Sequence, residues 1–270
     1  MDWGVGMDFN DLLMTARDSA GQSLDVPEKW GQGRATFGGL VAAILLQRIE
    51  VELGVQRPLR SLSLSFVAPV APGPLQVQVR LLREGKAAIQ VQATAIQQEQ
   101  VCAVMLASFG SDRESVVQVE HAGAPAFMAP DEVQAFPFIP GLTPDFTQYF
   151  DYRYTLGKMP FMGGQQTEMG GWIRLREASP ARVCPATLLA LMDAWPPAVF
   201  SLLKKPASGS SLTWTLSVVE LPADCSGNDW WQYRAAIQSS ANGYSYIDAT
   251  LWDRHGRACV LSRQTVSVFA

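Results

Sequence analysis

The two halves of the chain repeat one order of patterns, and this repeat constrains the fold more than any single motif does. The first half has a glycine-led apolar run at residues 37–49 and then an alternation of serine with apolar residues at 61–66. The second half has an apolar run at 186–200 and then a similar alternation at 211–216, an offset of 150 residues between the two alternating segments. Solenoid repeats have periods of roughly 20 to 50 residues. The longer offset therefore predicts two copies of one domain, with a functional cleft between them.

Composition excludes several classes of protein. The chain has 270 residues, 48% of them hydrophobic, which is enough for a sizeable core. Its formal charge of −4 and its scattered basic residues argue against nucleic-acid binding. The longest apolar run, residues 38–46, is far shorter than the roughly 18 residues of a membrane span, and residues 1–4 do not open a secretory leader. We therefore expect a cytoplasmic protein without a membrane span.

The cysteines and histidines show no metal-binding pattern in the sequence. No two cysteines form a C-x-x-C pair, and the chain has only two histidines. The residues concerned are Cys102, Cys184, Cys225, Cys259, His121 and His255. We therefore expect four reduced thiols, no metal and no cofactor.

Periodicity predicts an α+β fold with antiparallel sheets. The run at 40–46 is apolar on every side, as in a buried central helix. Alternating segments separated by turn signals predict strands with one covered face. In the first half these lie at 61–66, 76–81, 89–93 and 101–109; in the second half they lie at 149–156, 171–176, 211–221, 230–238, 244–252 and 258–269. A proline-rich segment without periodicity, 111–144, predicts the linker.

Asp193 is the polar residue that the repeat does not explain. Its neighbours three and four positions away are apolar, and its counterpart in the first half is Ala43 or Ile44. Pro196 and Pro197 follow it and would interrupt the helix. An unpaired buried carboxylate costs several kcal/mol, so Asp193 needs partners or a shifted ionisation. It is either a structural cap, a hydrogen-bonded core aspartate or a catalytic base.

Three further polar residues are candidates for the same chemistry. Gln264 shares one strand face with three valines, where its amide needs a partner or an open edge. Ser211 and Thr213 alternate on the polar face of a strand, which is also ordinary for a half-exposed sheet. The sequence has no G-x-S-x-G elbow, P-loop or dinucleotide fingerprint. Aspartate, hydroxyl and amide together suit the activation of water for attack on a thioester, whose carbonyl is electrophilic.

These residues lie in motifs that resemble the acyl-CoA thioesterase II-like (TesB-like) family of double-hotdog proteins. The likeness extends over nearly the whole chain, and the order of the motifs is its strongest feature. The motifs are Phe37-Gly38-Gly39, Arg60 to Phe66, Leu82-Arg83-Glu84-Gly85, Ala107-Ser108-Phe109, Gly171-Trp172-Ile173-Arg174 and Met192 to Pro197.

The resemblance implies two fused hotdog domains, each a long helix wrapped by a curved antiparallel sheet. It implies an N-terminal hotdog domain at 1–115, a linker at 116–145 and a C-terminal hotdog domain at 146–270 that carries the catalytic aspartate. The implied activity is metal-free hydrolysis of acyl-CoA to free acid and CoA. The implied catalytic residues are Asp193, Gln264 and a hydroxyl from Ser211 or Thr213, because this sequence departs from the family pattern at that strand; Gly38, Gly39 and Arg60 would bind substrate.

Two other functions compete with this interpretation. A non-catalytic hotdog module that binds acyl-CoA or acyl chains is the main alternative, since a fold can outlive its activity. A hotdog dehydratase is less favoured, because such enzymes pair aspartate with histidine and no histidine lies near Asp193 in the sequence. Acyl chain length, the contacts to the CoA phosphates and self-association stay open.

Overall fold

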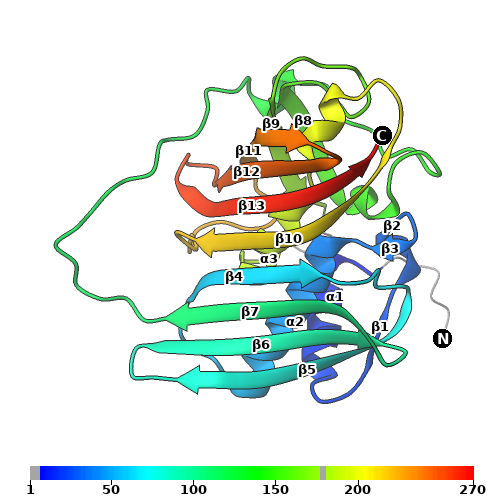
Figure 1. Ribbon diagram of the computed structural model, residues 1–270. Coiled ribbons are helices and arrows are strands. Elements are labelled where there is room, and N and C mark those ends of the chain that lie inside the picture. The colour runs from blue at the N-terminus through cyan, green and yellow to red at the C-terminus, as the bar shows by residue number, and fades with distance from the viewer. Residues whose placement is uncertain (1–6, 177–180) are drawn as a thin grey trace.

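The computed structural model describes residues 7–176 and 181–270, and within them one large antiparallel sheet dominates the fold. The sheet has 11 strands in the order β1-β5-β6-β7-β4-β10-β13-β12-β11-β9-β8, and the α-helices lie behind it in Figure 1. This is the α+β architecture that the periodicity predicts. No helix of the described residues is long and apolar enough to cross a membrane. Residues 1–4, inspected above for a leader, lie outside the described residues.

The first half of the chain forms one side of the sheet. Its long helix, α2 (Gly38–Leu53), is buried nearly all round, which matches its run of apolar residues. It ends where Gly54 adopts a left-handed conformation with φ of 59°. The remaining elements are α1 (Phe9–Asp18), β1 (Leu24–Val26), η1 (Glu28–Trp30), β2 (Gly31–Gln32), β3 (Ala35–Thr36), β4 (Leu59–Phe66), β5 (Gly73–Glu84), β6 (Ala88–Gln97) and β7 (Gln100–Gly110).

The second half forms the other side of the sheet. Its apolar run is divided at Pro196 and Pro197 into α3 (Pro185–Asp193) and the short helix η4 (Ala198–Leu202). The other elements are η2 (Pro130–Glu132), η3 (Asp145–Tyr149), β8 (Phe150–Leu156), β9 (Glu168–Leu175), β10 (Ser208–Val218), β11 (Trp231–Ala241), β12 (Tyr244–Trp252) and β13 (Ala258–Phe269).

The strand order is nearly a palindrome about the pair β4 and β10. Read outward from the centre, one half runs β4-β7-β6-β5 and the other runs β10-β13-β12-β11. The two alternating Ser/Thr segments thus lie side by side and antiparallel, with Ser63 opposite Thr215. This arrangement follows from the repeat, because each copy presents the same strand edge to the other.

The helices and an aromatic group join the two halves behind the sheet. Helices α2 and α3 pack against each other, and α2 also contacts β5, β6 and β7. The Trp30 and Tyr149 rings stack at 4.2 Å between centroids, and Phe37 stacks on Phe146 at the same distance. These contacts fix the start of α2 against the second half of the chain.

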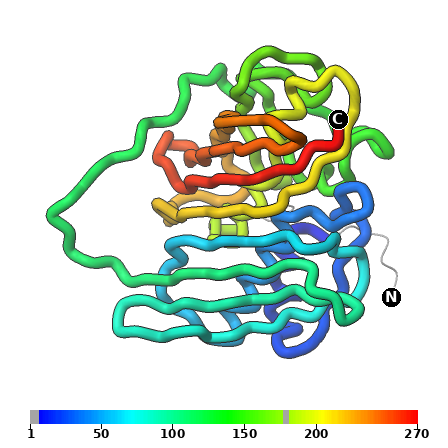
Figure 2. Tube along the Cα trace, viewed as in Figure 1, coloured from blue at the N-terminus to red at the C-terminus, as the bar shows by residue number. Residues whose placement is uncertain are grey.

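The segment between the halves leaves the sheet and returns to it. Residues 111–129 contain no helix or strand, and they swing away from the body of the molecule in Figures 1 and 2. The predicted linker contains this stretch and also the short helix η2, and its bounds stay a prediction. Helix α1 is an element that the sequence analysis did not predict; its N-cap Asp8 accepts a hydrogen bond from the backbone of Asp11.

Candidate active site

Asp193 is the last residue of α3, and it lies where that helix meets the start of α2. The prolines that follow end the helix directly behind it, because they cannot donate the backbone hydrogen bonds that would continue it. The backbone carbonyl of Ala194 accepts a hydrogen bond from the Tyr152 hydroxyl at 3.1 Å, which anchors the residue next to Asp193. The end of the helix, the two prolines and the anchored Ala194 therefore fix the position of the carboxylate.

Two glycines let the start of α2 approach this carboxylate. A Cβ on Gly38 would lie 2.9 Å from Asp193 Oδ2 and 3.1 Å from the Phe66 ring. A Cβ on Gly39 would lie 2.4 Å from the Phe37 ring and 3.1 Å from Asp193 Cβ. Real side chains essentially never tolerate the shorter of these contacts, so glycine is needed here for close approach.

Asp193 has two hydrogen-bond donors in this position. Gln264 Nε2 donates to Asp193 Oδ1 at 2.7 Å, and the backbone N–H of Gly39 donates to the same carboxylate. The Gln264 side chain is on the inner face of β13, where the pairing places it opposite the buried Trp214. The structure thus brings together Asp193, Gln264, Gly38 and Gly39, four of the residues that the sequence analysis singled out.

The electrostatics of Asp193 favour a proton acceptor that works near neutral pH. Burial raises the pKa of Asp193 to about 7, against the hydrogen bonds from Gln264 and the Gly39 backbone, which lower it. The positive end of the α2 dipole acts in the same direction as those donors. Desolvation outweighs these stabilising interactions, so the Asp193 carboxyl gains and loses its proton within the physiological pH range.

A β-bulge places the two candidate hydroxyls on opposite faces of β10. The pairing with β13 aligns Ser211 with Val266 and Thr213 with Thr265, so Leu212 is the extra residue. Val266 is fully buried on the inner face, and the Ser211 side chain therefore points inward as a diagonal neighbour of Gln264. Thr213 points to the exposed outer face.

Arg60 is not part of this group. The Phe66 ring lies against the start of α2, at one end of β4. Arg60 lies near the opposite end of the same strand, about 20 Å from Phe66. Its guanidinium donates to the Gly110 carbonyl at 2.8 Å and pairs with Asp112, beside a surface cavity of about 660 Å³. A role for Arg60 in substrate binding stays a prediction.

The sequence analysis missed the aromatic residues around Asp193. Trp195 stacks on Tyr233 with 5.1 Å between ring centroids, and Tyr154 packs edge-on against the same indole at 4.8 Å. Burial and, to a lesser extent, the charge of Asp193 raise the pKa of the Tyr233 phenol. The Trp-Pro-Pro sequence after Asp193 was a signal for part of this group, whereas Tyr154 and Tyr233 come from distant strands.

The described residues that could jointly hold a metal ion lie elsewhere. They are Asp224 and Cys225, in the segment between β10 and β11, and His255, in the turn before β13; about 20 Å of strand separates the start of β13 from Gln264. The group around Asp193 itself offers one carboxylate, one amide and backbone N–H donors. It can hold a water molecule, accept its proton and stabilise negative charge on a neighbouring oxygen.

Family models match both halves of the chain. Residues 26–110 match the model of the acyl-CoA thioesterase N-terminal domain, and residues 130–268 match that of the C-terminal domain. A search of curated protein sequences gave no significant match.

Several solved structures have a fold similar to that of this chain. A hotdog-fold protein of unknown function from Alicyclobacillus acidocaldarius is 22% identical, with a TM-score of 0.83 over 94% of this chain and 98% of that one. A proposed thioesterase II from Thermobifida fusca is 20% identical, with a TM-score of 0.79 over 95% and 98%. The acyl-CoA thioesterase II TesB2 from Mycobacterium marinum is 18% identical, with a TM-score of 0.69 over 87% and 90%. These likenesses show the hotdog fold, and because the C-terminal family model spans more than half of the sequence, the chain belongs to the acyl-CoA thioesterase family.

Proposed function

We propose that this protein hydrolyses acyl-CoA to free acid and CoA, with Asp193 as the base that activates water. The observation that carries the proposal is the hydrogen bond of 2.7 Å between Gln264 and Asp193, located at the glycine-lined start of α2. A part-buried carboxylate whose pKa is raised to about 7 is matched to proton transfer at neutral pH. Membership of the acyl-CoA thioesterase family supports the substrate class.

We further propose that the site is formed by two fused hotdog domains, at 1–115 and 146–270, with a linker at 116–145. The nearly palindromic strand order and the packing of α2 on α3 support this division. The site then has contributions from both domains, because Gly38 and Gly39 come from the first and Asp193 and Gln264 from the second. Neither domain alone would contain a complete site.

The proposed mechanism has one general base and no covalent intermediate. Asp193 and Gln264 hold a water molecule beside the thioester carbonyl carbon. Asp193 takes a proton from this water as its oxygen forms the new C–O bond, and the carbonyl oxygen becomes an oxyanion. We assign the stabilisation of that charge to Gly38 N–H at the start of α2, because Gly39 N–H donates to Asp193 and the N–H groups of Leu40 and Val41 donate to the Phe37 carbonyl. The C–S bond then breaks, and the proton on Asp193 passes to the CoA thiolate.

Ser211 is the hydroxyl that this arrangement favours. The bulge at Leu212 turns it to the inner face beside Gln264, while Thr213 faces outward. Its hydroxyl can both donate to and accept from water. We assign it to orienting the attacking water together with Gln264.

Replacing the base tests the proposal. Asp193→Asn keeps the shape of the side chain and removes its ability to accept a proton, so thiol release from a panel of acyl-CoAs should fall by roughly 10²- to 10⁴-fold. Asp131→Asn, at an exposed aspartate of η2, serves as the matched control and should keep full activity.

Two results would contradict the assignment in different ways. Undiminished turnover by Asp193→Asn would mean that another group is the base. If the unaltered protein binds acyl-CoA and releases no thiol from any member of the panel, the protein is the binding module named above as the alternative.

A further inference from the structure

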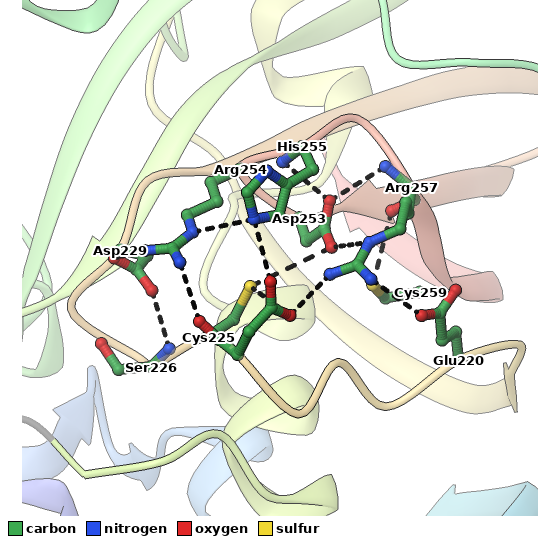
Figure 3. Close-up of polar contacts among 10 residues, drawn as sticks. Glu220, Cys225, Ser226, Asp229, Asp253, Arg254, His255, Arg257 and Cys259 are labelled. Carbon is green, nitrogen blue, oxygen red and sulfur yellow. Dashed lines mark hydrogen bonds and ion pairs between the residues drawn. The ribbon is translucent and has the colours of Figure 1, made fainter.

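A second cluster of polar side chains lies far along β13 from Asp193, where two loops meet (Figure 3). One is the turn between β12 and β13, at residues 253–257; the other is the segment 219–229 between β10 and β11. Arg254 in the turn donates to the Asp224 carbonyl in the segment at 2.9 Å, and Val219 N–H and Glu220 N–H donate to the carbonyl of Cys259, which follows the turn in β13. The positions of the side chains on the two loops are thus fixed relative to each other.

Three side chains of different chemistry converge in this cluster. The ligand atoms of Asp224, Cys225 and His255 all lie within 4.8 Å of one another. His255 Nε2 lies 3.1 Å from Asp224 Oδ2, and Cys225 Sγ lies 3.9 Å from Asp224 Oδ1. Zinc bonds of about 2.0 Å to nitrogen and oxygen and about 2.3 Å to sulfur imply tetrahedral ligand separations of about 3.3–3.6 Å. The 3.9 Å separation is a few tenths of an ångström too long, and the widest separation, up to 4.8 Å, must shorten by more than about 1 Å, so side-chain rotation is needed to complete the geometry.

The surroundings of the cluster have more negative than positive charge. Its ion pairs join two guanidinium groups, Arg254 and Arg257, with four carboxylates. The carboxylates are Glu220, Asp224, Asp229 and Asp253. The Cys225 sulfur lies 3.9 Å from Asp224 Oδ1 and 4.0 Å from Asp253 Oδ2, so two carboxylates face it. A cation beside the sulfur would relieve this negative potential.

Asp253 holds the histidine loop in place for such a cation. Its carboxylate is fully buried; Oδ1 accepts hydrogen bonds from the backbone N–H of His255 and of Arg257, each at 2.9 Å. Its other oxygen, Oδ2, accepts from Arg257 Nε at 2.6 Å and lies 4.0 Å from Cys225 Sγ. Asp253 thereby fixes the backbone on which the histidine ring is mounted, as groups behind metal ligands commonly do.

We propose that Asp224, Cys225 and His255 bind a zinc ion, with water in the fourth position, and that the ion links the segment 219–229 to the β12–β13 turn. Thiolate, imidazole and carboxylate are all zinc ligands. Binding displaces the Cys225 thiol proton to solvent, and His255 binds as neutral imidazole. His255 Nε2 also accepts a hydrogen bond from Arg254 Nε at 3.1 Å, and this bond breaks when the nitrogen binds the metal instead.

The sequence pattern could not suggest this site. Cys225 and His255 are 30 residues apart, without the short spacing that marks zinc motifs, and the fold alone brings them together. The proposed zinc ion therefore departs from the expectation, drawn above from the cysteines and histidines, that the chain binds no metal; the ion takes no part in the thioesterase chemistry.

Metal titration of the full-length protein tests the proposal. After treatment with a chelator, the protein should bind one Zn²⁺ per chain in calorimetry, and Co²⁺ should produce a thiolate-to-metal charge-transfer band. Cys225→Ser should abolish this band, and Cys225→Ser and His255→Asn should each weaken zinc binding by at least roughly 10- to 100-fold, the loss that even outer-shell changes cause. Cys259→Ser, at the neighbouring buried thiol, and His121→Asn, at the other histidine, are the matched controls and should bind zinc as the unaltered protein does.

The rival interpretation is an ion-pair network that holds the two loops without a metal. It predicts no zinc binding by the unaltered protein, or binding that is unchanged in Cys225→Ser and His255→Asn, and either result would overturn the proposal. Thiol release from acyl-CoA should be the same with and without zinc, because the cluster is remote from Asp193. Failure of the zinc site would thus leave the proposed hydrolase function untouched, and the reverse also holds.

Discussion

At the residue scale, the behaviour of Asp193 is decided by competition between burial and hydrogen bonding. Removal from water raises the pKa of the carboxyl group, while Gln264 and the Gly39 backbone stabilise its charged form. Burial prevails, and the pKa rises to about 7. A fully exposed aspartate would be ionised at neutral pH but would be a weak base, whereas this one is stronger and still partly ionised.

The first prediction at this scale concerns pH. If ionised Asp193 is the base, kcat/KM should increase as pH rises through about 7 and level off above it, because the deprotonated fraction follows the pKa. The measurement is thiol release between about pH 5 and pH 9, at acyl-CoA concentrations well below KM. A profile that is flat across this range would exclude Asp193 as the titrating base.

The second prediction at the residue scale concerns Gln264, which donates a hydrogen bond to the Asp193 carboxylate. Gln264→Ala removes a group that orients water, so turnover should fall by roughly 10- to 1,000-fold. It also removes a donor that lowers the pKa of Asp193, so the pH profile should shift to higher pH. Gln76→Ala, on the exposed side of β5, is the control. Weaker acyl-CoA binding with unchanged turnover of bound substrate would make Gln264 a positioning residue for the ligand.

At the element scale, two local features shape the site: a bulge in β10 and a glycine pair at the start of α2. The bulge assigns opposite faces to Ser211 and Thr213, although their spacing of two residues would put them on the same face of a regular strand. The glycine pair allows a helix start and a helix end to meet at the distance of direct contact.

The bulge leads to a paired prediction. Ser211→Ala should reduce turnover by roughly 10-fold or more, because the inward hydroxyl helps to orient water, while Thr213→Ala should leave turnover unchanged. The two variants are matched controls for each other, since each removes one hydroxyl from the same strand. Steady-state thiol release decides between them, and the reverse result would show that the outer face of β10 contributes to the site.

A further prediction concerns the glycine pair at the start of α2, Gly38 and Gly39. Gly38→Ala should displace the Asp193 carboxylate, because the new methyl group would lie 2.9 Å from Oδ2, and turnover should fall while the fold persists. Overpacking of this kind typically costs about 1–3 kcal/mol. Gly123→Ala, where a Cβ meets nothing within 4 Å, should have no effect on turnover or thermal stability. Full activity of Gly38→Ala would show that the close approach is dispensable.

The elements themselves were largely predictable from the sequence, and their exceptions have physical causes. Strict alternation marked β4, β5 and β6, and an apolar run without a polar face marked α2 as a buried helix. Helix α1 was missed although its buried residues, Phe9, Leu12, Leu13 and Ala16, have the spacing of an amphipathic helix. The bulge was missed because one extra residue in a strand leaves the alternation of residue types readable in either register.

At the scale of the whole molecule, the repeat predicted that two similar halves would face each other, and the sheet shows how they join. β4 and β10 pair at the centre, so the site forms where the helices behind them meet. Contacts between residues 71 positions apart, such as Gln264 with Asp193, follow from this assembly and not from any local pattern. The candidates could be named from the sequence, but their hydrogen bond could not.

The final prediction follows from the difference between the halves. Ala43 and Ile44, the first-half counterparts of Asp193, are fully buried, so that position offers neither a carboxylate nor space for one. An unreactive thioether analogue of acyl-CoA should therefore bind with a stoichiometry of one per chain in calorimetric titration. The separately expressed halves should be insoluble or inactive, because each would expose the face that α2 and α3 bury against each other. A clear value of two ligands per chain would mean that the first half retains a pocket, and that the loss of the aspartate did not remove it.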